Sequence, residues 1–203
     1  MNFRSLIAIF TLASGFSTAA SAVDLAAGEA TAGAICAGCH MPDGNSTVDM
    51  FPKLAGQHAQ YLTKQLNDYK NGKRTDATMN GMAAALVTAD DIANVSAFYA
   101  SKKATVANAD ANKVALGKAI YRGGDTSSAL PACMGCHGSE AAGNPAAKFP
   151  ALAGQHAAYT IKQLNSFRKG ERTNDSNNMM QEVVSKMSAA EIDAVANYIA
   201  QMK

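Results

Sequence analysis

The sequence of 203 residues contains no tryptophan, and aromatic residues make up only 6% of it. Large aromatic side chains usually contribute much of the packing energy of a core, so a chain with so few needs another group to fill its interior. An excess of charge is also missing, because 18 basic residues face 16 acidic ones and the net charge is +2. Without a basic excess to neutralise phosphates, nucleic-acid binding is not expected.

Long apolar segments are missing as well. Residues 6–16 form an apolar stretch, too short to cross a bilayer, that follows Arg4 and precedes the small residues 20–22. This pattern predicts a cleaved export signal over residues 1–22 and a periplasmic mature protein; a retained membrane anchor is the alternative. No later segment approaches about 20 apolar residues, so we expect at most peripheral association with a membrane.

A tandem duplication organises the rest of the chain. The segment Phe-Pro-x-Leu-Ala-Gly-Gln-His-Ala begins at Phe51 and again at Phe149. Residues 104–112 lie between the two copies, are mostly small and polar, and lack an apolar period, which is typical of an exposed linker. The sequence therefore predicts a first domain over residues 23–103 and a second over residues 113–203.

The hydrophobic spacing within each copy is helical. Residues 56–70 carry apolar groups near a period of 3.6 residues, which predicts a helix. Residues 88–91 (Thr-x-x-Asp) and 188–191 (Ser-x-x-Glu) match the capping box that starts a helix. No stretch shows the period-two alternation of a strand, so the predicted fold is all-α in both domains.

The few cysteines are concentrated in one motif. All four lie in two Cys-x-x-Cys-His sequences, which are Cys36, Cys39 and His40 in the first domain and Cys133, Cys136 and His137 in the second. A disulfide framework, a thioredoxin-like redox pair and a zinc site are the alternatives, but no further cysteine, βαβ context or obvious extra ligand supports them. Covalent attachment of a c-type haem explains the spacing directly, since the two thiols bind the porphyrin and the histidine binds the iron. A porphyrin would also fill a core that is poor in aromatic residues.

A second axial ligand is expected from a methionine in a loop downstream of each motif. Met79 and Met180 hold equivalent positions when the copies are aligned on the residues ahead of the capping boxes. Alignment on the capping boxes themselves pairs Met79 with Met179, and Met82 is a further candidate in the first domain. The sequence leaves these alternatives open.

Two histidines also recur in the duplication and could compete as ligands. His58 and His156 each follow Gly-Gln at a predicted helix start, close behind the proximal histidine. We expect them to be polar groups at the surface or beside the iron ligands, with bis-histidine ligation as the alternative.

In combination these motifs resemble the dihaem cytochrome c4 family. Each Cys-x-x-Cys-His is followed by Phe-Pro-x-Leu-Ala-Gly-Gln, a Tyr-x-x-x-Gln-Leu helix and a methionine, and the resemblance covers essentially the whole mature chain. It implies two class I cytochrome c folds about a pseudo-twofold axis and two covalently bound haem c groups, with the haem propionate edges near the domain interface. It also implies that the carbonyls of Pro52 and Pro150 accept a hydrogen bond from the proximal histidines.

The resemblance implies one-electron transport and no enzymatic activity, because protein ligands fill both axial positions of each iron. We expect a periplasmic carrier that delivers electrons toward a terminal oxidase and is reduced by a quinol–cytochrome c reductase. The main alternative is an electron-accepting subunit of a periplasmic dehydrogenase such as a flavocytochrome. A dihaem peroxidase is a third class, but it needs an open iron position.

Overall fold

The computed structural model describes residues 22–203, so the predicted export signal lies outside the described residues except for its last position. The helices of the first half are α1 (Leu25–Thr31), η1 (Ala32–Cys36), α2 (Ala37–His40), α3 (Ala59–Lys70), α4 (Ala77–Ala84) and α5 (Ala89–Ala100). Those of the second half are α6 (Ala111–Gly123), α7 (Met134–His137), α8 (Ala157–Arg168), η2 (Ser176–Asn178), α9 (Met179–Ser185) and α10 (Ala189–Gln201). The described part of the chain forms two isolated β-bridges and no strand, which confirms the all-α prediction.

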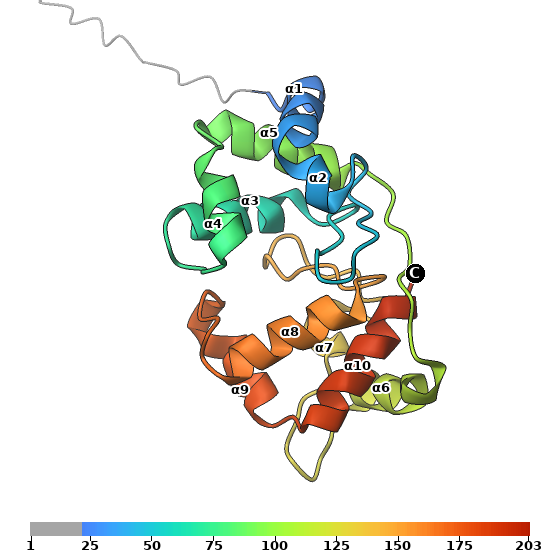
Figure 1. The fold of residues 1–203 in the computed structure, drawn as a ribbon. Coiled ribbons are helices and arrows are strands. Elements are labelled where there is room, and N and C mark those ends of the chain that lie inside the picture. Colours follow the sequence, from blue (N-terminus) through green and yellow to red (C-terminus); the bar gives the residue numbers. More distant parts are fainter. Residues whose placement is uncertain (1–21) are drawn as a thin grey trace, which may run out of the picture.

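The two halves stack against each other, and the segment between α5 and α6 runs along one side of the pair (Figure 1). This segment is largely exposed but held to both halves. The Thr105 amide donates to Asn45 Oδ1 at 2.9 Å, and the Ala107 amide donates to the Ala200 carbonyl at 2.8 Å. Helix α6 begins at Ala111, inside the range predicted as linker, because the Asp110 side chain caps it.

Helix α3 starts later than its apolar period suggests. The predicted helix over residues 56–70 begins at Ala59, with His58 at the N-cap. Gly56 has a φ of 69°, in the left-handed region, so the chain turns there before it becomes helical. The turn directs His58 away from the first half, toward the second.

Both capping boxes are confirmed. Thr88 Oγ1 accepts from the Asp91 amide at 3.0 Å, and the Asp91 carboxylate accepts from the Thr88 amide at 2.8 Å. Ser188 and Glu191 form the same reciprocal pair at the start of α10. Each box satisfies two backbone amides that the helix itself leaves unbonded. These caps start α5 and α10, which supply much of each core.

Each core is built where two helices cross closely at a glycine. Helix α1 packs on α5 at Gly28, and α6 packs on α10 at Gly117. A Cβ atom added to Gly117 would lie 2.0 Å from the Ala194 carbonyl oxygen, and one added to Gly28 would lie 2.3 Å from that of Asn94. Real atoms do not approach so closely, so any side chain at either position forces the helices apart.

We therefore expect Gly117→Ala to destabilise the protein by about 2–3 kcal/mol, because the crossing helices must separate and lose core contacts. Gly123→Ala is the control, since it lies in the same helix and an added Cβ meets nothing within 4 Å. We expect the control to be neutral or slightly stabilising. Urea unfolding of the two variants compares them, and equal midpoints would contradict the close crossing.

Candidate haem sites

The two motif histidines are held in the same way. His40 ends α2 and His137 ends α7, and their side chains are buried, with 6% and 8% exposed. The Nδ1 atom of His40 lies 2.9 Å from the Pro52 carbonyl oxygen, and that of His137 lies 3.0 Å from the Pro150 carbonyl oxygen. These bonds confirm the expected role of both prolines. They fix the ring orientation and the position of the Nδ1 proton.

The remaining nitrogen of each ring is available to a metal. Within residues 22–203, the Nε2 atoms of His40 and His137 have no hydrogen-bond partner, and both residues line a cavity. Burial lowers the pKa of both histidines, and the hydrogen bond to the proline carbonyl only partly opposes this effect. The rings are therefore neutral at pH 7, which is the form that binds a metal through Nε2.

The cysteines lie beside these histidines on the cavity wall. Cys36 and Cys133 are half-buried, and burial raises the pKa of each thiol to about 11. Redox-active thiols of the thioredoxin type have a lowered pKa instead, so the raised pKa of these two thiols argues against that alternative. Within residues 22–203, the structure shows no group of three or more histidine, cysteine or acidic side chains that could hold a metal ion.

The cavity fits two haem groups. It has a volume of about 1040 Å³ and is bordered by both Cys-x-x-Cys-His motifs, by aliphatic side chains and by methionines of both domains. A cavity for one drug-sized ligand spans about 300–1,000 Å³, so this one exceeds that range. Each half of the cavity offers two thiols, one imidazole with a free Nε2 and thioether side chains. This donor set suits a covalently attached haem.

The methionines lie in helices and not in the expected loops. Met79 is in the first turn of α4, and Met180 is in the first turn of α9. All four candidate methionines border the cavity, but Met79 and Met180 are half-buried, whereas Met82 is 42% exposed and Met179 is 38% exposed. Met180 also packs against the core of the second domain. Burial thus favours Met79 and Met180 as iron ligands over Met82 and Met179.

An aspartate that precedes the helix holds the backbone at each of these methionines. The Met79 amide donates to Asp76 Oδ1 at 3.2 Å, and the Met180 amide donates to Asp175 Oδ2 at 2.8 Å. An acidic residue at a helix N-terminus stabilises the first turn, since it bonds amides that lack helical partners. The first turn of α4 and of α9 is therefore fixed relative to the cavity.

The recurring histidines have a different role from iron ligation. Neither His58 nor His156 is among the residues that line the cavity. His58 Nε2 lies 2.8 Å from the Ala142 carbonyl oxygen, and His156 Nε2 lies 2.9 Å from that of Ser46, in both cases across the domain boundary. The expectation of a surface position is wrong for His156, which is only 8% exposed. Both side chains link the domains.

His156 predicts a pH dependence of stability. Burial lowers the pKa of His156, assisted by Lys53, while the Ser46 carbonyl and Asp49 oppose this effect. The unfolded chain binds a proton near pH 6.5 but the folded chain binds it only at lower pH, so this contribution is complete above about pH 6.5 and is lost as the pH falls below it. We expect the melting temperature to fall between pH 7.5 and 5.5, and to fall less in His156→Gln.

The matched control is His58→Gln, at the pseudo-symmetric position with the equivalent bond to Ala142. We expect this variant to keep the full pH dependence of the unmodified protein. If His156→Gln and the unmodified protein show the same pH dependence of melting, His156 is not the group responsible.

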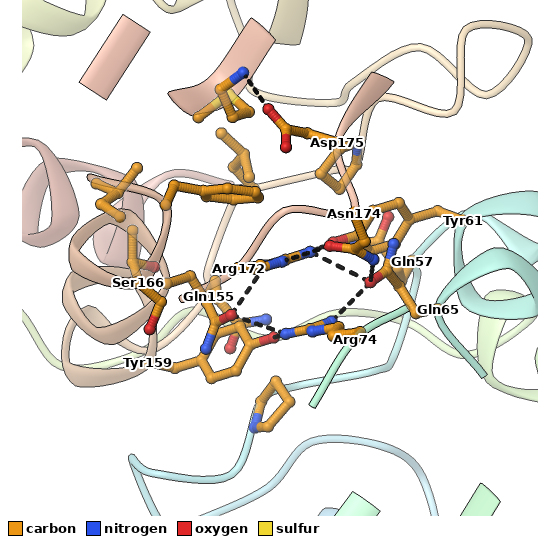
Figure 2. Close-up of a pocket in the computed structure, with 18 of the residues that line it drawn as sticks. Gln57, Tyr61, Gln65, Arg74, Gln155, Tyr159, Ser166, Arg172, Asn174 and Asp175 are labelled. Carbon is orange, nitrogen blue, oxygen red and sulfur yellow. Dashed lines mark hydrogen bonds between the residues drawn. The ribbon is translucent and has the colours of Figure 1, made fainter. Parts of the chain in front are cut away.

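Reciprocal hydrogen bonds join the domains about a pseudo-twofold axis. Gln57 accepts from the Ala151 amide at 2.9 Å and donates to its carbonyl at 2.8 Å. Gln155 forms the same pair of bonds with the backbone of Lys53, at 2.9 and 3.0 Å. A larger polar network borders the cavity between the domains (Figure 2). Sequence reasoning missed these hydrogen bonds between the domains, although the two glutamines belong to the duplicated segment.

Comparisons with known proteins agree with this arrangement. The cytochrome c family model matches the chain twice, over residues 25–103 and 114–203. The chain is 48% identical to cytochrome c4 of Pseudomonas aeruginosa over 180 residues, which cover 88% of this chain and 89% of the relative. It is 37% identical to a thiosulfate dehydrogenase electron acceptor of Stutzerimonas stutzeri, over 82% of this chain and 78% of the relative.

A solved structure shows the same fold. The crystal structure of reduced recombinant cytochrome c4 from Pseudomonas stutzeri superimposes with a TM-score of 0.85 at 41% sequence identity. The match covers 90% of this chain and 100% of the solved one. Both halves and their relative placement are thus shared with that protein. Within residues 22–203, no helix is long and apolar enough to cross a membrane.

Proposed function

The chain belongs to the dihaem cytochrome c4 family, as two cytochrome c domains with two covalent haem c groups, and we propose that it is a periplasmic carrier delivering electrons toward a terminal oxidase. Electron transport without enzymatic activity is common to this family. The observation that carries the proposal is one cavity in which each domain supplies both a buried imidazole and a half-buried thioether.

The proposed attachment and ligand residues follow the duplication. Thioether bonds form at Cys36 and Cys39 in the first domain and at Cys133 and Cys136 in the second. The axial ligands are His40 with Met79 and His137 with Met180. The Pro52 and Pro150 carbonyls hold the proximal rings. The aspartates that accept from the methionine amides hold the helix turns that carry the methionines.

The bound haem supplies one-electron chemistry at its iron, and the chain determines how that chemistry is used. A thioether ligand favours the reduced iron and gives a higher potential than a second imidazole would. If His40 and Met79 bind one iron and His137 and Met180 the other, as proposed, the chain would leave neither iron a position for oxygen or a substrate. The histidine rings are buried, and aliphatic side chains line the cavity. These features suit a carrier and not a peroxidase.

A second candidate function is supported by the thiosulfate dehydrogenase electron acceptor relative. In that case the chain would accept electrons from a periplasmic dehydrogenase, and a flavocytochrome is another possible partner of this class. The two functions use the same haems and differ only in the donor. A quinol–cytochrome c reductase is the expected donor of the carrier.

Purification from the native periplasm separates the two functions. We expect a free dihaem protein that membranes reduce through the quinol–cytochrome c reductase, with inhibition of that reductase abolishing its reduction. We also expect oxidase-containing membranes to reoxidise it. A dehydrogenase that co-purifies in stable stoichiometry and reduces the protein on addition of its own substrate would favour the second function.

A further inference from the structure

Two arginines, one from each domain, face each other at the centre of the interface (Figure 2). Arg74 donates through Nη1 to Gln65 Oε1 at 2.7 Å, within its own domain. Through Nη2 it donates to two residues of the other domain, Tyr159 Oη at 3.0 Å and Gln163 Oε1 at 2.7 Å. The guanidinium group of Arg74 is thus positioned mainly by side chains of the second domain.

Arg172 forms the mirrored contacts. It donates through Nη1 to Gln163 Oε1 at 2.8 Å, within its own domain. Through Nη2 it donates to Tyr61 Oη at 3.1 Å and to Gln65 Oε1 at 3.2 Å, both in the first domain. The two amide oxygens therefore each accept from both arginines, and they hold two like charges together.

These two charges are buried without a counter-charge. Arg74 is 6% exposed and Arg172 is 8% exposed, and within residues 22–203 neither forms an ion pair with a carboxylate. A guanidinium group stays charged at any physiological pH, so it cannot escape by losing its proton. Two buried like charges bonded only to neutral oxygens are costly unless an anion joins them.

Acidic side chains of the network and of the cavity wall are held by other groups. Asp68 pairs with Lys64 at 2.5 Å, and Asp76 pairs with Lys162 at 3.4 Å. Each of these carboxylates therefore neutralises a lysine. Asp175 also borders the cavity and accepts from the amides of Met180 and Gln181. None of these three carboxylates is bonded to either arginine, so an anion from outside the polypeptide would balance the arginines.

The pKa of Tyr61 reflects the positive potential that the two arginines create. Burial alone would raise the pKa of its hydroxyl group, but Arg172 and Arg74 more than offset burial, and the pKa is lowered below its ordinary value. A site that stabilises a phenolate will also stabilise a carboxylate.

Both arginines and the side chains that hold them border the cavity that carries the two Cys-x-x-Cys-His motifs. A haem has one anionic part, its two carboxylate side chains, and the rest of its ring is apolar. The aliphatic walls near the cysteines and methionines suit the ring, whereas the polar network between the domains suits the carboxylates. Guanidinium groups form strong charge-assisted hydrogen bonds with carboxylates. Among the described residues, Arg74 and Arg172 each keep at least one N–H without a partner.

We propose that Arg74 and Arg172 form one binding site for the carboxylate side chains of both haems, and that their charge raises the reduction potential of each haem. The inference rests on the proposed haem binding. A nearby positive charge favours the reduced iron, which carries one positive charge less. Because each guanidinium is held by the opposite domain, removing either one alters the surroundings of both haems.

The test is an anaerobic optical redox titration of Arg74→Gln and Arg172→Gln. We expect each substitution to shift both one-electron steps to lower potential, with a change of roughly three- to tenfold in each reduction equilibrium constant; tenfold is 59 mV for one electron. Lys169→Gln is the control, since it removes an exposed positive charge, with 62% of its side chain accessible. We expect the control to leave the midpoint potentials of both one-electron steps unchanged.

Tyr159→Phe separates charge from hydrogen bonding, because it removes one bond to Arg74 and keeps the charge. We expect a smaller shift than in Arg74→Gln. Replacing chloride by phosphate at constant ionic strength should leave the potentials of the unmodified protein unchanged, since the proposed anions are part of the bound haem. A dependence on the free anion would overturn the proposal in favour of a soluble ligand.

The mass of each denatured variant measures how many haems are bound to the chain. A chain without haem contradicts the proposed function. A dihaem chain in which Arg74→Gln or Arg172→Gln leaves either step unmoved overturns only the role of the arginines.

Discussion

Replacing both cysteines of the second motif, in Cys133→Ser/Cys136→Ser, is expected to leave one covalent haem on the chain where the unmodified protein carries two. Serine cannot form the thioether bond, and Cys133 packs against the core of the second domain. A unit of about 80 residues rarely gains more than about 3–5 kcal/mol from its own core, so losing the porphyrin should unfold this domain. The denatured mass and the far-ultraviolet circular dichroism measure both effects.

Gly135→Ala is the matched control for that variant. Gly135 lies between the two cysteines, and an added Cβ meets nothing within 4 Å. We expect this variant to keep two haem masses and the full helical signal. If the serine variant also kept two haem masses after acid–acetone extraction, covalent attachment at Cys133 and Cys136 would be excluded.

Met180→Ala is expected to abolish half of the weak near-infrared band that arises from sulfur-to-iron charge transfer in the ferric protein. The band requires a thioether on the iron, and the protein should show it for two haems. Met79→Ala should remove the other half. Each variant opens one iron position, so carbon monoxide should bind to one haem per reduced chain.

Met179→Ala is the control, because Met179 is adjacent in sequence but 38% exposed, whereas Met180 is half-buried against the core. We expect Met179→Ala to keep the full band. The opposite outcome is that Met179→Ala loses half of the band and Met180→Ala loses none of it. This result would show that the alignment of the two copies that pairs Met79 with Met180 is wrong by one residue.

The sequence supports strong predictions where a pattern has a local physical cause. The Cys-x-x-Cys-His spacing predicts the haem because two thiols and an imidazole on one turn suit one porphyrin. The capping boxes at Thr88 and Ser188 predict the starts of α5 and α10, since the same four residues form every bond involved. The sequence predicts the start of α3 at residue 56, whereas the helix begins at Ala59. The period of the apolar residues does not reveal the left-handed turn at Gly56.

The interface between the domains was not predictable in the same way. Gln65 and Arg74 look like ordinary solvated positions when one copy of the duplication is considered alone. Arg74 donates to Tyr159 and Gln163 of the other copy, and Gln65 accepts from Arg172 of the other copy. Only the placement of the two domains brings these residues together. The burial of His156 has the same origin, because the Ser46 segment of the first domain covers it. A polar residue repeated in both copies is the signal that could have indicated a symmetric contact.

The most direct test of the carrier function is an anaerobic coulometric titration of the unmodified protein, carried out under argon and under carbon monoxide. Closed His/Met coordination at both irons predicts that two electrons enter each chain in one-electron steps. It also predicts that the midpoint potentials are the same under both gases. Uptake of fewer than two electrons, or a positive shift of either midpoint under carbon monoxide, would show a missing haem or an open iron and contradict the account.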